Sequence, residues 1–566
     1  MQSRVLIALS LALWASCGGS EQSTTPTTAP APNGGEAPAN AHETRDTLVI
    51  GYPADANNLL FVVSEAVWDT NVSNSLAVPI IDSEFDCSLK KKPGLFKDWK
   101  WSDDGKIITV TMRDDISWED GTKVSAQDVA FTWDLIADPE VASPRLNWVE
   151  RLVEGKRPLI VNDTTLEWHF TEAYDRDTQT SHISGGVLAP MHLLKDADRK
   201  TLRGHEVNAQ SPVSYGPWTL KTWEKDQRIV LEPNPKFTGP DEWRPNLNRV
   251  VFKITPEYQT RLLELKKGAI DMMDDINIAD ADRLRREHPE IRLVRRGWRS
   301  NDYVAWNLQN PLFADKQVRH ALAKAVNVDE MIGKLLTSET GESYAKRMVG
   351  TITPALCGVH NESITPIAQN VEEAKAMFAK AGWTDSNGDG ILDKGGKKFS
   401  FTLSTNSSNS VRVDAQVLLQ SQLKAVGVEV NLETLDTNAF YDNLRKRDFD
   451  AALAGWSAAL YVDPTPLWQC ETEAKKHEFN FTSYCNEDVD ALIAKGMATA
   501  DPKEAAPVWQ ELQAKIHDDQ PYLNLWWKDE IVGLNERFED YQIDVLSAYG
   551  HLHKWKVPED KVKYKR

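Results

Sequence analysis

A strand–helix–strand pattern in the second half of the chain constrains its fold more than any other feature. Residues 399–403 alternate as a strand does, residues 411–426 have helical periodicity that ends at Gly427, and residues 428–432 alternate again. A crossover helix of this length joins strands that pair in parallel, because an antiparallel hairpin needs only a short turn. The pattern predicts a βαβ unit and a largely parallel sheet in this part of the protein.

The first third of the globular chain is predicted to be richer in hairpins. Residues 47–52 are expected to form a buried strand, and residues 106–112 alternate at period two. Ser125 precedes a helical stretch at residues 126–136, and Asp128 stands three positions later, as in an N-terminal capping arrangement. These signals predict a mixed α/β architecture, and 566 residues are too many for one hydrophobic core.

The N-terminus has the layout of a secretory signal. A positive charge at Arg4 precedes a ten-residue apolar run, Val5–Trp14, and two small residues lead directly to Cys17. Small residues before a cysteine resemble the lipobox of bacterial lipoproteins. We therefore predict a signal peptide at residues 1–16 and an exported protein in the periplasmic space, anchored to the membrane by lipid at Cys17. The alternative is ordinary cleavage nearby, which would leave Cys17 free.

Composition limits the partners of the mature chain. Residues 17–46 are mostly small and polar, so we predict a disordered tether. The net charge of −19 argues against nucleic acid and against adsorption to anionic lipid. No later run of about 20 apolar residues follows, so we expect membrane contact only through the lipid.

The remaining cysteines permit two disulfides in an exported chain. Cys470 and Cys485 are close in sequence and are the predicted pair, which leaves Cys87 for Cys357. The twelve histidines are scattered without the spacing of a metal site.

Several segments, in a fixed order, resemble one known family. They are Thr109–Trp118 with Asp120-Gly121-Thr122 and Ala126–Val129; Gly216-Pro217-Trp218 with Leu231–Asn234; Arg261–Leu265 with Gly268 and Asp271; Trp306-Asn307 with Val318–Leu322; and Phe449–Leu453 with Gly455-Trp456 and Asp463-Pro464. Together the segments resemble the bacterial extracellular solute-binding proteins of family 5, the dipeptide, oligopeptide and nickel binders. The resemblance spans roughly residues 48–545.

This resemblance implies an α/β, two-lobe, periplasmic-binding-protein-like fold (type II, a Venus flytrap) with an extra third domain. The implied boundaries place lobe I at residues 47–72, 205–296 and 528–566, the extra domain at 73–204, and lobe II at 297–527. A ligand would be enclosed at the hinge between the lobes. The closed form would then dock on the permease subunits of an ABC importer, as a monomer without cofactors.

The same resemblance directs attention to the stretch after the fifth segment. Trp456 ends a predicted parallel strand, where ligands of open α/β sheets bind, and core packing is the alternative. Peptide binders of the family hold the α-ammonium with an aspartate shortly after the Gly-Trp pair. Here residues 457–462 contain no acid, and Asp463 stands in a turn-forming Asp-Pro dipeptide. This absence counts against a standard peptide ligand.

Other candidate ligand contacts are mostly aromatic, which would suit a sugar or another flat solute. Arg412 could approach a ligand carboxylate, and a solvated charge on a helix face is the alternative. The further candidates are Asn406, Tyr303, Trp306, Tyr215 and Trp468.

One loop matches the first nine positions of an EF-hand calcium loop. Asp385, Asn387, Asp389 and Asp393 would supply the oxygen ligands, but Gly396 stands where a bidentate glutamate is needed. A polar turn between a helix and a strand is the alternative.

Motifs of common enzymes, such as G-x-S-x-G, H-E-x-x-H and the Walker loop, are missing from the sequence. The prediction is a binding protein and not an enzyme, with a peptide or similar small polar solute as ligand. The alternatives are an oligosaccharide receptor of the same fold, or a chemosensory accessory without transport.

Overall fold

The computed structural model describes residues 47–563, apart from residues 65, 85, 87–89, 154–156, 174–175, 210–212 and 473–478. The predicted signal peptide and tether, with Cys17, lie outside the described residues, as does Cys87. Within the described part, no helix combines the length and the apolar character needed to cross a membrane. The described residues belong to one compact unit, and the predicted domain boundaries stay predictions about its subdivision.

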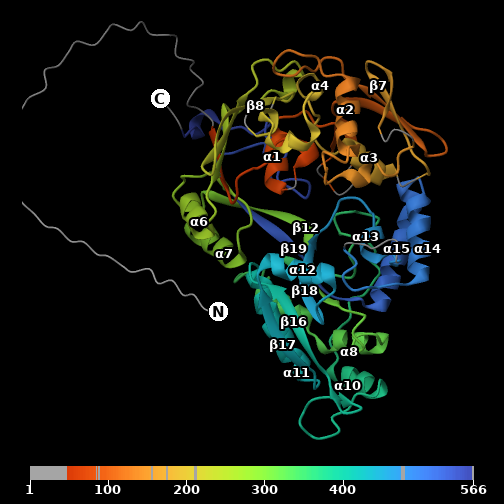
Figure 1. Cartoon of the computed structure of the whole chain (residues 1–566). Helices are drawn as coiled ribbons and strands as arrows, with labels where there is room; N and C mark the ends of the chain where they lie inside the picture. Colours follow the sequence, from red (N-terminus) through yellow and green to blue (C-terminus); the bar gives the residue numbers. More distant parts are fainter. Residues whose placement is uncertain are drawn as a thin grey trace, which may run out of the picture. The chain divides into compact units, whose positions relative to one another are not determined.

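One large mixed sheet connects the N-terminal, central and C-terminal parts of the chain (Figure 1). Its strands, in spatial order, are β17 (Glu429–Leu435), β16 (Ser400–Asn406), β18 (Ala451–Ser457), β12 (Ile291–Trp306), β19 (Tyr522–Asn535), β11 (Met272–Met273), β1 (Thr47–Tyr52), β10 (Arg249–Ile254), β9 (Arg228–Pro233) and β8 (Trp218–Glu224). The short strand β13 (Ala345–Arg347) pairs with β19 outside this order.

Two long antiparallel strands hold the large sheet together. β12 has 16 residues and β19 has 14, and they pair from Ile291 opposite Asn535 to Ala305 opposite Tyr522. The second half of β12 also pairs with β18, whereas the end of β19 pairs with β11. The register between β12 and β19 shifts between Arg296 and Ser300. Both strands therefore cross the predicted boundaries between lobe I and lobe II.

The predicted βαβ unit is confirmed. β16 and β17 are parallel, and α11 (Ser410–Lys424) joins them and packs against both. Gly427 has a φ of +82°, a conformation that glycine adopts without strain, and it ends the connection to β17.

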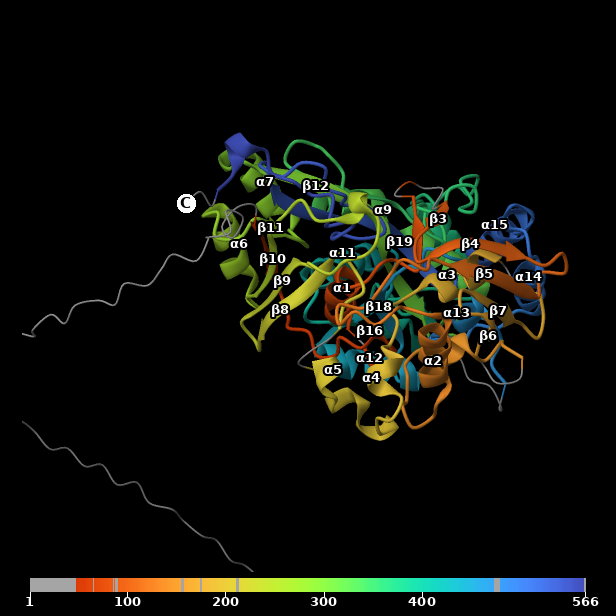
Figure 2. The same ribbon diagram turned by 90° about the horizontal axis from the view of Figure 1, so that it is seen from above.

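The hairpin-rich first third forms a separate antiparallel sheet, on the opposite side of the view in Figure 2 from β8, β9 and β10. Its order is β4 (Phe96–Trp101), β5 (Ile107–Met112), β7 (Thr165–His169) and β6 (Leu159–Asn162). Helix α2 (Ala126–Ala137) begins with the predicted capping box, in which the Ser125 N–H donates to Asp128 Oδ2 over 2.9 Å. A two-stranded pair, β2 (Ile81–Ser83) with β3 (Lys91–Pro93), precedes it.

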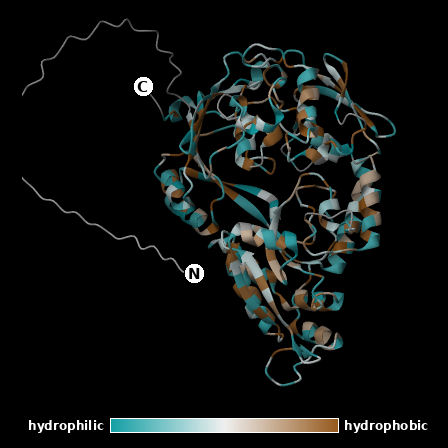
Figure 3. Cartoon of the chain, in the orientation of Figure 1, coloured by the Kyte–Doolittle hydropathy of each residue, from teal (hydrophilic) through white to brown (hydrophobic). Residues whose placement is uncertain are grey.

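The remaining helices surround these sheets, and those at the outside, such as α14 and α15, carry hydrophilic and hydrophobic residues side by side (Figure 3). They are α1 (Val67–Ser75), α3 (Arg176–Ser184), α4 (Met191–Leu194), α5 (Glu206–Ala209), α6 (Tyr258–Lys266), α7 (Ile278–Glu287), α8 (Lys316–Ala325), α9 (Val328–Leu335), α10 (Val371–Lys380), α12 (Thr437–Lys446), α13 (Thr465–Trp468), α14 (Glu487–Ala498) and α15 (Pro502–Asp519). The short strands β14 (Asp393–Lys394) and β15 (Lys397–Lys398) form a two-stranded pair.

The chain after β19 packs back on the first strand. The Arg537 guanidinium donates to Asp271 Oδ2 over 3.0 Å and to the Thr47 carbonyl over 2.6 Å. Trp555 is fully buried in the hydrophobic cluster that contains Leu48. The C-terminal segment therefore packs against β1 and its neighbours in the sheet.

The disulfide between Cys470 and Cys485 is confirmed. Cys357 is also disulfide-bonded; its pairing with Cys87 stays a prediction, because Cys87 is not among the described residues.

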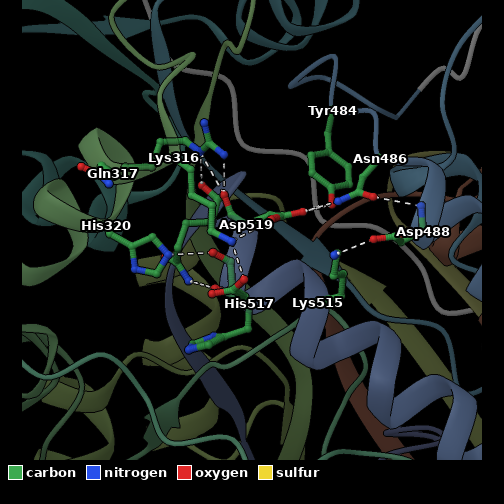
Figure 4. A network of polar contacts seen from close by, with 12 residues as sticks. Lys316, Gln317, His320, Tyr484, Asn486, Asp488, Lys515, His517 and Asp519 are labelled. Carbon is green, nitrogen blue, oxygen red and sulfur yellow. Dashed lines mark hydrogen bonds and ion pairs between the residues drawn. The ribbon is translucent and has the colours of Figure 1, made fainter. Parts of the chain in front are cut away.

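The fourth family segment caps the end of α15. Arg319, which is buried, donates to the carbonyls of Asp519 and Gln520 and to that of Phe313. In the same place, the Asp519 carboxylate binds the Tyr484 hydroxyl over 2.6 Å and Lys316 Nζ over 3.1 Å (Figure 4). Positive charge at the carbonyl end of a helix complements its dipole, so this segment stabilises the fold.

Candidate functional site

Trp456 lies at the carboxyl end of β18, within a group of aromatic rings. It is half-buried, and its indole stacks on Phe481 with ring centroids 5.4 Å apart. On its other side is Tyr303, at 6.2 Å, which in turn stacks on Tyr522 at 3.9 Å. The edge of this group is accessible, because Phe479 is 40% exposed. The arrangement offers a flat, partly open aromatic surface at the end of the sheet.

A buried ion pair lies one strand away from Trp456. Arg412, in the first turn of α11, donates from Nε to Asp302 Oδ1 over 2.7 Å and from Nη1 to Asn406 Oδ1 over 3.0 Å. Trp526 Nε1 donates to the other carboxylate oxygen of Asp302 over 2.8 Å, and Lys528 Nζ lies 3.6 Å from it. Burial alone would raise the pKa of Asp302, but Lys528 and Arg412 hold it below its ordinary value.

Arg412 is therefore not a solvated charge on a helix face, and that alternative is wrong. Its guanidinium is neutralised by a carboxylate with no exposed surface. A charged pair this deeply buried fixes α11 to β12. Any ligand group that reached Arg412 would have to share it with Asp302.

The buried Arg412–Asp302 pair leaves no space for a side chain at Gly455, the residue before Trp456. A Cβ atom at Gly455 would overlap the Asn301 carbonyl oxygen and the Arg412 guanidinium, and would lie 2.6 Å from Asp302 Oδ1. The Gly-Trp dipeptide of the fifth family segment thus combines a position that must be small with an aromatic ring.

The segment after β18 reaches the predicted extra domain. The Asp463 carboxylate lies 3.4 Å from Arg151 Nη2 and accepts from the Thr465 N–H over 3.1 Å. The Val462 carbonyl accepts from the Thr178 hydroxyl of α3 over 3.2 Å. Asp463 therefore forms the predicted turn and also an ion pair that bridges β18 to the extra domain.

His182 of α3 is enclosed by two aromatic rings at the same contact. Its imidazole stacks on Trp148, with centroids 5.5 Å apart, and meets the edge of Tyr461 at 5.2 Å. Burial lowers the pKa of His182 to about 4; nearby Asp463 opposes this shift and Arg151 adds to it. The ring is therefore neutral at physiological pH.

Charged side chains gather where β12 and β19 cross between the predicted lobes. Arg296 Nη1 binds Glu530 Oε2 over 2.7 Å, and Arg299 Nε donates to the Ala458 carbonyl over 3.1 Å. Burial and the neighbouring Asp274 raise the pKa of Asp275 to about 6. The Asp275 side chain is nevertheless exposed to solvent. Its φ of +57° is a strained conformation for a residue other than glycine.

Four of the predicted ligand contacts are packed inside hydrophobic cores, and one of them is Tyr303, which has no exposed surface. Tyr215 meets Trp118 at 4.9 Å and Trp306 stacks on Phe313 at 4.9 Å, and both are at most 1% exposed. Trp468, also buried, donates from Nε1 to the Thr351 hydroxyl over 3.1 Å. The structure thus brings together Trp456, Tyr303, Asn406 and Arg412, with Asp463 at the contact to the extra domain, and places Tyr215 elsewhere.

The loop with the predicted calcium ligands forms a turn with many internal polar contacts, and calcium binding to it stays a prediction. Asp385 accepts from the backbone N–H groups of Gly388 and Gly390, and the Asp389 carboxylate binds Lys398 Nζ at 2.6 Å. Asn387 accepts from the Asp389 N–H over 2.9 Å, and Asp393 accepts from Ser386. No group of three His, Cys, Asp or Glu side chains in the described ranges is arranged to hold a metal ion.

The sequence reasoning did not identify Asp302, Arg151 or His182. Asp302 had a signal: it is the only carboxylate in β12 and stands next to the apolar end of that strand, where a buried carboxylate needs a partner. Arg151 and His182 had none, because their partners Asp463 and Tyr461 are about 300 residues away in the chain.

The Gly455→Ala variant should unfold more easily by about 3 kcal/mol, because the added methyl group displaces the buried Arg412–Asp302 pair. The matched control is Gly333→Ala in α9, where a Cβ meets no atom within 4 Å. There the change should raise stability by about 0.5–1 kcal/mol through a lower chain entropy of the unfolded state. Urea unfolding measures both, and equal effects would contradict the requirement for glycine.

The stability that depends on His182 should fall between pH 6.5 and pH 4. In this range the unfolded chain binds a proton at His182 and the folded protein does not. The free energy of unfolding therefore falls by about 3 kcal/mol as the pH is lowered through this range. In His182→Phe, which keeps an aromatic ring at the contact, this pH-dependent loss of stability should be absent. Urea unfolding at pH 7, 5.5 and 4 compares the two proteins, and parallel pH profiles would contradict the account.

Comparison with known proteins identifies the family of the chain. Residues 90–478 match the model of the bacterial extracellular solute-binding proteins, family 5. The oligopeptide-binding protein AppA of Bacillus subtilis (strain 168) is 29% identical over 517 residues, which are 90% of this chain and 91% of AppA. The probable D,D-dipeptide-binding periplasmic protein DdpA of Escherichia coli (strain K12) is 26% identical over 519 residues, 89% of this chain and 92% of DdpA.

A solved structure of Bacillus subtilis AppA in complex with a nonapeptide matches with a TM-score of 0.73 at 26% identity, and covers 91% of this chain and 100% of that chain. The match confirms the predicted α/β, periplasmic-binding-protein-like fold. These relatives are substrate-binding proteins and not enzymes, in agreement with the prediction. The chain belongs to the bacterial extracellular solute-binding proteins of family 5.

Proposed function

We propose that the protein captures a peptide, or a similar small polar solute, between lobe I with the extra domain and lobe II, and delivers it to the permease of an ABC importer. It acts as a monomer, held in the periplasmic space by a lipid at Cys17. The Trp456 aromatic group and the segment after β18 form the lobe II side of the site. The exposed Asp275 carboxylate contributes to the lobe I side.

The observation that carries this proposal is the extent of the match to AppA. The alignment covers 91% of this oligopeptide-binding protein, which supports a hinge of the same architecture. The structure of that relative was determined with a nonapeptide, so a scaffold of this kind accommodates a peptide of nine residues.

A second candidate ligand is an oligosaccharide, and a specific observation favours it. Residues 457–462 contain no acid, and the Asp463 carboxylate is engaged by Arg151 and the Thr465 N–H. A ligand ammonium at this place would therefore have to displace an existing ion pair. A sugar would need only the flat face of Trp456 and hydrogen bonds, which suits an uncharged site.

Peptide binding should raise the melting temperature of the full chain, because a ligand that binds only the folded state stabilises it. The experiment is a thermal-shift measurement with a random nonapeptide library, and with oligosaccharides and nickel chelates as separate arms. Trp456→Ala should weaken peptide binding about tenfold or more, since a central aromatic contact is lost.

The matched control is Trp101→Ala, which removes an indole from the separate four-stranded sheet and should leave affinity unchanged. A shift with oligosaccharides alone would establish the second candidate and reject the first. No shift in any arm would contradict both.

A further inference from the structure

A cavity is lined by the segment around α1 and by the C-terminal segment, and Trp456 is not among its lining residues. Its volume is about 370 Å³, which is in the range of small-molecule sites. The described residues that line it come from positions 71–243 and 546–554, and none of them comes from the predicted lobe II. The cavity is therefore formed by residues on one side of the predicted hinge alone.

The last turn of α1 supplies one polar wall. Asn74 is exposed and Asn71 is half-buried, so the cavity is open to solvent on this side. Asn71 Nδ2 donates to the Tyr52 hydroxyl over 3.1 Å, and the Ser75 hydroxyl donates to the Asn71 carbonyl over 3.0 Å. These contacts hold the side chains in place, and a carboxamide offers both donors and acceptors to a ligand.

Another part of the lining carries charges of both signs. His551 Nε2 lies 3.1 Å from Asp82 Oδ1, and Lys554 Nζ lies 3.2 Å from His551 Nδ1. Burial lowers the pKa of the lining residue His553 to about 3, so its imidazole is neutral at physiological pH. A strongly charged ligand would therefore meet both a carboxylate and an ammonium here.

Aromatic surface completes the lining. Trp243 is half-buried, and the Arg113 guanidinium lies 5.4 Å from its ring centroid. Trp218 and Tyr549 are buried next to it on the cavity wall. Carboxamides, the neutral imidazole of His553 and indole faces are suited to hydroxyl groups on an apolar ring face.

We propose that this cavity binds a neutral polyhydroxylated small molecule of monosaccharide or disaccharide size. Hydroxyl groups would bond to Asn71, Asn74 and the Asp82–His551 pair, and the carbon face would lie on Trp243. The site is separate from the solute site at the hinge, and it stands or falls independently of the proposed peptide function.

Isothermal titration of the full chain with a panel of neutral monosaccharides and disaccharides tests the proposal. At least one sugar should bind to the native protein. Asn74→Trp, which fills the mouth of the cavity with an indole, should abolish that binding, and Asn74→Ala should weaken it about fivefold, as expected for one lost hydrogen bond. Val67→Trp, an equal change on the same helix at a side chain that is 58% exposed and does not line the cavity, should leave it unchanged.

Trp456→Ala separates the two sites. Sugar binding that survives Trp456→Ala but not Asn74→Trp supports the cavity. Sugar binding that is lost only in Trp456→Ala takes place at the hinge site. That result overturns this proposal and supports an oligosaccharide as the ligand of the hinge site. Absence of heat with every sugar of the panel, or full binding by a folded Asn74→Trp protein, also overturns it.

Discussion

The antiparallel pairing of β12 and β19 is the constraint on which the rest of the structure depends. The two strands pair over almost their whole length. β12 also joins β18 beyond the register shift, and β19 also joins β11 and β13. The register shift between Arg296 and Ser300 marks the crossing point. A shift of register twists a strand pair locally, so bending there would move the two halves without breaking the sheet. The buried Asp302 carboxylate lies directly beyond it and ties α11 to the same strand.

Sequence patterns predicted the parts of the fold that depend on local periodicity. The βαβ unit around α11, the capping box at Ser125 and the disulfide between Cys470 and Cys485, which are close in sequence, could all be predicted. Contacts between segments distant in the chain could not be predicted. The enclosure of His182 by Trp148 and Tyr461 joins three segments, and no spacing in the sequence relates them. The candidate site was predicted only in part for the same reason.

Family resemblance predicted the fold better than the ligand, because the shared segments are mostly structural. Arg319 caps the end of α15, and Asn307 donates to the carbonyls of Arg447 and Phe449. Asp271 receives Arg537 from the C-terminal segment. None of these described contacts requires a ligand. Residues that would distinguish a peptide from a sugar lie in segments such as 457–463, which the family segments flank but do not specify.

Hydrogen–deuterium exchange of the full chain, with and without the random nonapeptide library, tests the central claim most directly. The account predicts slower exchange with peptide at residues 456–463 and in α3, on the two sides of the contact, and unchanged exchange in α10 on the far side of lobe II. Slow exchange reports amides that rarely open to solvent, so protection would locate the ligand between these elements. Peptide-dependent protection that excluded residues 456–463 and α3 would contradict the account.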